Sequence, residues 1–61
     1  MSIKVFIVDD HALVRTGFRL ILGREVDIEV LGEAESGEEA LPQIRKLKPD
    51  VVLCDLNLPG I

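Results

Sequence analysis

Three short apolar segments alternate along the chain with two segments in which apolar residues recur at helical spacing. The first, Ile3–Val8, and the third, Val51–Cys54, each contain an uninterrupted apolar run of four residues. Such runs, rich in β-branched residues, are typical of strands buried on both faces. The second, Ile28–Ala34, carries Glu29 and Glu33 among its apolar residues. This mixed composition favours a strand at the edge of a sheet.

The first of the two intervening segments, residues 11–22, has the spacing of an amphipathic helix. Its apolar side consists of Leu13, Val14, Gly17, Phe18, Leu20, Ile21 and Leu22. Arg15 and Arg19 fall on the opposite side of a helical wheel, which we interpret as a solvated face. Asp10 is placed to cap the start of this helix, and Gly23 is placed to end it.

The second helical segment begins at a capping box. Ser36 is the predicted cap, and Glu39 follows three residues later. The apolar stripe of this helix comprises Ala40, Leu41, Ile44 and Leu47. Pro42 lies inside the helix and lacks an N–H group, so we expect either a kink or a short 3₁₀ start there rather than loss of the helix.

The alternation of strands and helices predicts an α/β fold with a parallel sheet and right-handed crossovers. The mixed strand suits an edge, so the predicted strand order is 2-1-3, with Ile3–Val8 in the centre. The third strand has the composition of an interior strand, yet none of the 61 residues is left to cover its outer edge. An open strand edge is a template for pairing, so we expect a homo-oligomer formed through it.

Composition narrows the classes of function. Apolar residues make up 48% of the chain, which excludes a disordered segment, and the formal net charge of −4 disfavours a nucleic-acid surface. Apolar runs of four residues fall far short of the roughly 20 that cross a bilayer, so no membrane association is expected. The single cysteine, Cys54, and the absence of a signal-peptide pattern favour the cytoplasm. A chain of this length is marginal alone, which indicates a truncated domain or an assembly of copies.

Acidic residues follow two of the predicted strands at the same edge of the sheet. Asp9 and Asp10 come after the first strand, and Asp55 comes after the third. Ligands of parallel α/β sheets bind beyond the carboxyl ends of the strands, at the point where the strand order reverses. Neighbouring strands lie about 4.8 Å apart, so the three carboxylates are expected to converge and their repulsion to raise at least one pKa.

A hard divalent cation removes this repulsion. Mg²⁺ takes oxygen ligands, commonly one or two carboxylates together with water and a phosphate oxygen. A carboxylate in such a site can act as a nucleophile and form an aspartyl phosphate. The alternative for Asp9 or Asp10 alone is structural, because a single Asp after a strand is commonly a turn former or a helix cap. His11 is expected to be a surface residue of the first helical turn, and Cys54 a small core residue.

Residues 8–11, 13–17 and 50–60 resemble the receiver domain of bacterial two-component response regulators, most closely the NarL/FixJ type. The spacing between Asp10 and Asp55 also fits this resemblance. It implies a flavodoxin-like (CheY-like) fold, a sensor histidine kinase or a small phosphodonor as the source of a phosphoryl group, and a transcriptional output domain in the parent protein. The module itself is then not an enzyme.

The resemblance also implies roles for individual residues. Asp55 matches the phosphoacceptor. Asp10 and Asp55 match direct Mg²⁺ ligands, Asp9 matches an acid that acts through water, and Asn57 matches a ligand through its backbone carbonyl. Residues 59–60 match the loop that shapes the far side of the acceptor. Docking of the kinase becomes an alternative role for the arginines of the first helix.

The chain also departs from the family's pattern. Receiver domains of this family have five strands, whereas three are predicted here, so residues 1–61 are expected to be the N-terminal half of a receiver domain. The Thr or Ser after the fourth strand, the Lys after the fifth and the helix-turn-helix output domain are not among these residues. Two functions stay open: a phosphoacceptor module, and an incomplete receiver that acts only as a sheet-edge interaction module. A third function, a phosphatase or phosphotransferase, is ranked below these two, because the sequence does not supply the additional acid, base and substrate pocket that such an enzyme needs.

Overall fold

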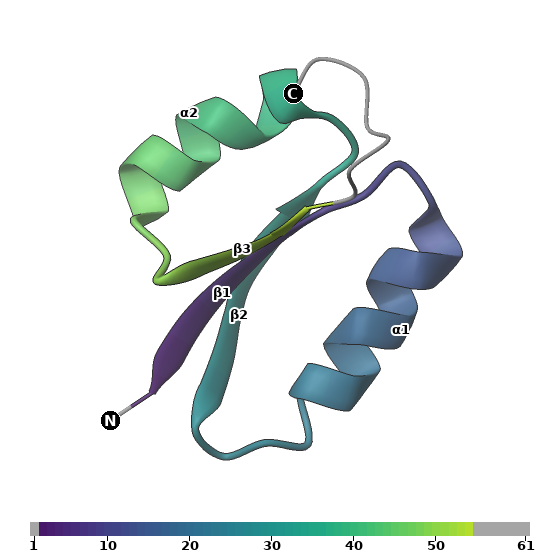
Figure 1. The fold of residues 1–61 in the computed structure, drawn as a ribbon, viewed down its shortest axis with the longest axis vertical. Helices are drawn as coiled ribbons and strands as arrows, with labels where there is room; N and C mark the ends of the chain where they lie inside the picture. Colours follow the sequence, from purple (N-terminus) through teal and green to yellow (C-terminus); the bar gives the residue numbers. More distant parts are fainter. Residues whose placement is uncertain (1, 55–61) are drawn as a thin grey trace.

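A computed structural model describes residues 2–54 of the chain, and their elements follow the predicted order (Figure 1). The elements are β1 (Ile3–Val8), α1 (Ala12–Leu22), β2 (Ile28–Ala34), α2 (Gly37–Leu47) and β3 (Val51–Cys54). The strands form one parallel sheet in the order β2-β1-β3, with α1 on one side and α2 on the other (Figure 1). The predicted α/β architecture and strand order are therefore confirmed. Within residues 2–54, no helix has the length and apolar character needed to span a bilayer.

The core is centred on β1, because this strand has a neighbour on each side and a helix over each face. Residues 5–8 of β1 are all buried, and Phe6 and Ile7 have no exposed surface. Ala34 at the end of β2 and Ala40 on α2 complete the buried apolar set. The continuous apolar run at the start of the sequence thus correctly indicated a strand buried on both faces.

A register shift between β1 and β2 brings a glycine against the central aromatic ring. Val5 pairs with Val30, but the next residue of β1, Phe6, pairs with Gly32. A Cβ atom at Gly32 would lie 3.1 Å from Cε2 of Phe6. The glycine therefore leaves room for the buried ring, and the bulge is a feature that the alternation of residue types did not predict.

The start of α2 confirms the predicted cap at Ser36. Its Oγ accepts a hydrogen bond of 3.2 Å from the backbone N–H of Glu39. In a capping box, the Glu39 side chain would accept the backbone N–H of Ser36. Here Oε2 of Glu39 instead accepts the backbone N–H of Glu35, one residue earlier, at 3.4 Å. The helix persists across Pro42, as predicted, but it is α-helical from its first residue, so the alternative of a 3₁₀ start is wrong. Ala40 packs into the core just before the proline and holds this turn in place.

The start of α1 differs from the prediction. The helix begins at Ala12 with His11 as its cap residue, and no side chain makes the capping hydrogen bond, so the predicted cap at Asp10 is wrong. The predicted end is confirmed, because Gly23 is the cap residue there and its N–H donates to the Arg19 carbonyl at 2.9 Å. No residue of α1 is fully buried, and Leu13 is 84% exposed. Leu20 and Ile21 are also 67% and 63% exposed, so part of the apolar side of α1 is uncovered among residues 2–54.

Candidate functional site

The two strands that precede the predicted acidic cluster lie side by side. Val8, the last residue of β1, is the register partner of Cys54, the last residue of β3. The residues that precede Asp9 and Asp55 in the sequence are therefore neighbours in the sheet. Cys54 itself is partly buried and packs against the core, as predicted for a small core residue. The predicted roles of Asp55, Asn57 and residues 59–60 lie outside the described residues and stay predictions.

Asp9 is the one charged residue that is buried among those the structure describes, with 7% of its surface exposed. Its backbone N–H donates to the Ala34 carbonyl at 3.1 Å, which ties the end of β1 to the end of β2. Its carboxylate Oδ1 accepts the backbone N–H of His11 at 2.8 Å and lies 2.9 Å from Nδ1 of the same histidine. These contacts fix both the backbone and the carboxylate of Asp9.

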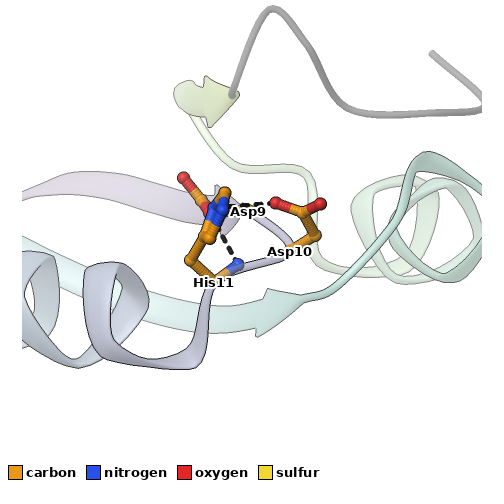
Figure 2. Close-up of side chains that lie close together, drawn as sticks. All are labelled: Asp9, Asp10 and His11. Carbon is orange, nitrogen blue, oxygen red and sulfur yellow. Dashed lines mark hydrogen bonds and ion pairs between the residues drawn. The ribbon is translucent and has the colours of Figure 1, made fainter.

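His11 folds back over the acidic pair, as Figure 2 shows. Its Nδ1 lies 2.8 Å from Oδ1 of Asp10 as well as 2.9 Å from Oδ1 of Asp9. The side chain of His11 is 65% exposed, so the prediction of a surface residue holds, but its contact with both acids was not foreseen. The available signal was local: an Asp commonly accepts the N–H of the residue two positions later, and this turn brings the ring back to the acids.

The pKa of Asp9 is lowered from its ordinary value of 3.8. The largest cause is the hydrogen bond from the backbone N–H of His11, which stabilises the ionised carboxylate. Burial opposes this effect, while the side chain of His11 and the charge of Arg15 add to it. Repulsion between carboxylates, which was expected to raise at least one pKa in the cluster, therefore does not dominate at Asp9.

Arg15 contradicts its assignment to a solvated helix face, whereas Arg19, whose side chain is 48% exposed, fits that assignment. The side chain of Arg15 is only 13% exposed, and its Nη1 donates to the backbone carbonyl of Asp9 at 2.6 Å. Nε lies 3.8 Å from Oε1 of Glu33 on β2, and Nη1 of Arg19 lies 3.7 Å from Oε2 of the same glutamate. A helical wheel shows only the residues of one helix, so it missed the acceptors that the neighbouring strand and loop provide. The signal in the sequence was Glu33, an acid within a largely apolar strand.

The acidic end of β1 has a donor set that suits a hard cation. One ligand atom from each of Asp9, Asp10 and His11 lies within 4.8 Å of the others. The side chain of Asp10 is 46% exposed, so a cation held there keeps access to water. Mg²⁺ commonly retains several waters and takes one or two carboxylates, so the two aspartates fit this ion. The imidazole is better matched to softer transition metals, and here it already contacts both carboxylates.

Two apolar grooves flank β3. One, of about 470 Å³, lies toward α1 and has Asp9 and His11 among its lining residues. The other, of about 460 Å³, lies toward α2 and is lined in part by Leu41, Ile44 and Val52. The side of β3 away from β1 has no strand partner among residues 2–54. The sheet therefore carries apolar surface around its edge strand on both faces.

A family model and two sequence relatives that match this chain all belong to response regulators. A family model described as the response regulator receiver domain matches residues 5–61. The response regulator GacA of Pseudomonas syringae pv. syringae is 56% identical over 59 residues, and the response regulator protein VraR of Staphylococcus aureus is 52% identical over 56 residues. These alignments cover 97% and 92% of this chain but 28% and 27% of the two relatives. The chain thus spans little more than a quarter of their length.

Solved structures agree with the sequence relatives. The signal receiver domain of the response regulator NarL from Mycobacterium tuberculosis matches with a TM-score of 0.91 and 38% identity, over 98% of this chain and 48% of that chain. The response regulator domain of Thermotoga maritima CheB matches with a TM-score of 0.91 and 36% identity, over 100% of this chain and 46% of that chain. With this fold, and with a family match over most of its length, the chain belongs to the response regulator receiver domain family of two-component systems.

Proposed function

We propose that the chain is the N-terminal half of a receiver domain and carries its phosphoacceptor, Asp55. The observation that carries this proposal is the register of β1 and β3, in which Val8 and Cys54 are partners. Adjacent parallel strands bring the residues after their carboxyl ends to one edge of a sheet. Asp9 and Asp10, which follow β1, and Asp55, which follows β3, then form a single site.

Within this site the acidic residues have separate roles. Asp10 and Asp55 would bind Mg²⁺ directly, Asp9 would act through water, and Asn57 would offer its backbone carbonyl. The lowered pKa of Asp9 keeps its carboxylate ionised, and the low exposure of Asp9 keeps it in place. Bound Mg²⁺ supplies charge neutralisation for the oxygens of the transferring phosphoryl group.

The reaction is a phosphoryl transfer from a sensor histidine kinase. A carboxylate oxygen of Asp55 forms a bond to phosphorus while the bond between phosphorus and the donor's histidine nitrogen breaks, and the released imidazole nitrogen keeps the electron pair. The phosphorylated module controls a transcriptional output domain of the parent protein in the cytoplasm. Contact with DNA belongs to that output domain, since the net charge of −4 disfavours binding of this segment to nucleic acid.

Intact-mass measurement after incubation with acetyl phosphate and Mg²⁺ tests the proposal. We expect slow, substoichiometric addition of one phosphoryl group, because the Lys that follows the fifth strand in the family is not among the 61 residues. Asp55→Asn removes the acceptor and abolishes the addition, whereas Asp27→Asn, at an exposed position in the turn before β2, leaves it unchanged. Labelling that survives in Asp55→Asn, or that proceeds equally well without Mg²⁺, contradicts the proposal.

The second candidate function is a sheet-edge interaction module that pairs with another copy of the chain. It is favoured by β3, where Val51 is 42% exposed and Val52 is 39% exposed, and by the apolar grooves on either side. An open edge of this kind is a template for strand addition. A chain that forms oligomers and is never phosphorylated supports this candidate over the first, and a well-folded monomer contradicts it.

A further inference from the structure

The peptide that joins Asp9 to Asp10 is held by a side chain from another element. Nη1 of Arg15, on α1, donates to the carbonyl oxygen of Asp9 at 2.6 Å, and the arginine side chain is 13% exposed. A hydrogen bond from a charged donor is roughly twice as strong as one between neutral groups, and limited access to water increases its strength. The contact lies in the loop that carries the acidic pair, although Arg15 itself is six positions along the chain from Asp9.

Glu33 of β2 orients this arginine. Nε of Arg15 lies 3.8 Å from Oε1 of Glu33. Two atoms of this pair of residues, Nε of Arg15 and Oε2 of Glu33, are buried and have no hydrogen-bond partner. The attraction is therefore one of charge across a short gap, between a buried Nε and a glutamate side chain that is 36% exposed. Arg15, which belongs to α1, thus links its helix to β2 through Glu33 and to the loop after β1 through the carbonyl of Asp9.

We propose that Arg15 is a positioning residue for the cation site, and that it acts by fixing the plane of the Asp9–Asp10 peptide. A peptide unit is planar, so a fixed carbonyl of Asp9 also fixes the N–H and the Cα of Asp10. The direction in which the Asp10 carboxylate leaves the loop follows from that Cα. The inference rests on the proposed function, since it supposes that Asp10 binds the ion directly.

The need for this contact follows from the unequal support of the two acids. The carboxylate of Asp9 is buried and accepts hydrogen bonds from His11, and its N–H is held by Ala34. The carboxylate of Asp10 is 46% exposed and contacts the imidazole of His11, which is itself 65% exposed. Without Arg15, the carbonyl of Asp9 loses its hydrogen bond, so the plane of the Asp9–Asp10 peptide and the spacing of the two carboxylates are less tightly set.

Arg19 provides a matched control on the same helix. It also faces Glu33, with Nη1 at 3.7 Å from Oε2, and it is half-exposed. The Asp9 carbonyl is bonded by Arg15, so removal of Arg19 takes away a positive charge and a Glu33 pair without removing that bond. A general loss of charge or of helix packing affects both variants, whereas the hydrogen bond to the Asp9 carbonyl is lost only when Arg15 is replaced.

The test is a titration of the chain with Mn²⁺, a hard divalent probe for the Mg²⁺ site, followed by water-proton relaxation and combined with urea unfolding for each variant. Groups that orient metal ligands typically change affinity by 10- to 100-fold, so Arg15→Ala is expected to weaken Mn²⁺ binding by about tenfold. Arg15→Lys keeps one donor but not the fork that also faces Glu33, so it is expected to lie between Ala and the native residue. Arg19→Ala is expected to bind Mn²⁺ as the native chain does.

Equal Mn²⁺ affinity in the native chain and in both Arg15 variants overturns the proposal, and so does an equal loss in Arg19→Ala. If Arg15→Ala does not fold, Arg15→Lys decides the matter by the same comparison. The chemical shifts of the Asp9 carbonyl carbon and the Asp10 amide nitrogen, measured without metal, test the role of Arg15 separately from the proposed metal site. If these shifts change in Arg15→Lys but not in Arg19→Ala, Arg15 fixes the Asp9–Asp10 peptide, even if the native chain binds no Mn²⁺. Absence of Mn²⁺ binding by the native chain contradicts the proposed metal site. Unchanged shifts in both variants overturn the role of Arg15 in fixing this peptide.

Discussion

Replacement of Gly32 by alanine tests the packing that centres the sheet on β1. An added Cβ atom would lie 3.1 Å from Cε2 and 3.6 Å from Cδ2 of Phe6, and 3.7 Å from Oε1 of Gln43. The ring of Phe6 has no exposed surface, so it cannot move into solvent and must displace its own neighbours. Overpacking of this kind costs about 1–3 kcal/mol.

A gain opposes this cost. Alanine restricts the unfolded chain more than glycine does, which stabilises the folded state by about 0.4–1 kcal/mol where the backbone tolerates the change. The net expectation for Gly32→Ala is a loss of about 1 kcal/mol from the free energy of unfolding. A chain of this length typically has a total of about 3–9 kcal/mol, so the loss is easily measured.

Gly17 of α1 is the matched control. A Cβ atom there meets nothing within 4 Å, and the residue lies within a helix. Gly17→Ala is therefore expected to raise the free energy of unfolding by about 0.5–1 kcal/mol. Urea unfolding followed by far-ultraviolet circular dichroism measures both variants at one protein concentration. The packing argument is refuted if Gly32→Ala is as stable as the native chain or more so, while Gly17→Ala behaves as expected.

Three further predictions concern the cap, the sheet edge and the acidic pair. Ser36→Ala removes the acceptor of the Glu39 N–H and should lower the free energy of unfolding by about 1 kcal/mol in the same urea assay; an unchanged midpoint contradicts the capping role. Val52→Lys places a charge on the open edge strand and should shift light scattering from oligomer to monomer, whereas Val26→Lys, at a position that is 93% exposed, should not. The folded-state pKa of Asp9 is lowered, so its stabilising effect is fully present above the ordinary pKa of 3.8 and is lost as pH falls through the lower folded value. Carboxyl-carbon NMR of Asp9 should therefore titrate below pH 3.8, and a midpoint above that value contradicts the hydrogen-bonding argument.

The sequence predicted the framework because the framework depends on local periodicity. An uninterrupted apolar run identified β1 as the central strand, and the two acids within 28–34 identified β2 as an edge. The cap at Ser36 could be predicted because it joins residues three positions apart. Each of these features is decided by neighbours in the chain.

The details of the site depend on contacts that the sequence does not display. Arg15 is buried because Glu33 and the Asp9 carbonyl lie opposite it, and both belong to other elements. A helical wheel assigns an arginine to the solvated side without knowledge of such partners. The helical wheel placed Leu13 on the apolar side of α1, yet Leu13 is 84% exposed, because residues 2–54 provide no element to cover it.

The position of the β-bulge likewise depends on three-dimensional packing. The shift of register occurs where the ring of Phe6 meets Gly32, and only the assembled sheet brings these residues together. The cap of α1 was misassigned to Asp10 for a related reason. The carboxylate of Asp9 takes the N–H of His11, so the chain turns one residue later than the sequence of residue types suggested.

Paramagnetic broadening of backbone amides by Mn²⁺ decides whether the acids after β1 and β3 share one ion, because it reports which residues surround a bound ion. Val8 and Cys54 are register partners, so we expect an ion at the carboxyl ends of β1 and β3 to affect the amides of the residues that follow both strands. The amides of Asp10 and Asp55 should broaden together at the same low ratio of Mn²⁺ to protein, and excess Mg²⁺ should restore both. Broadening at Asp10 while Asp55 stays sharp would contradict a shared site at the ends of the two strands.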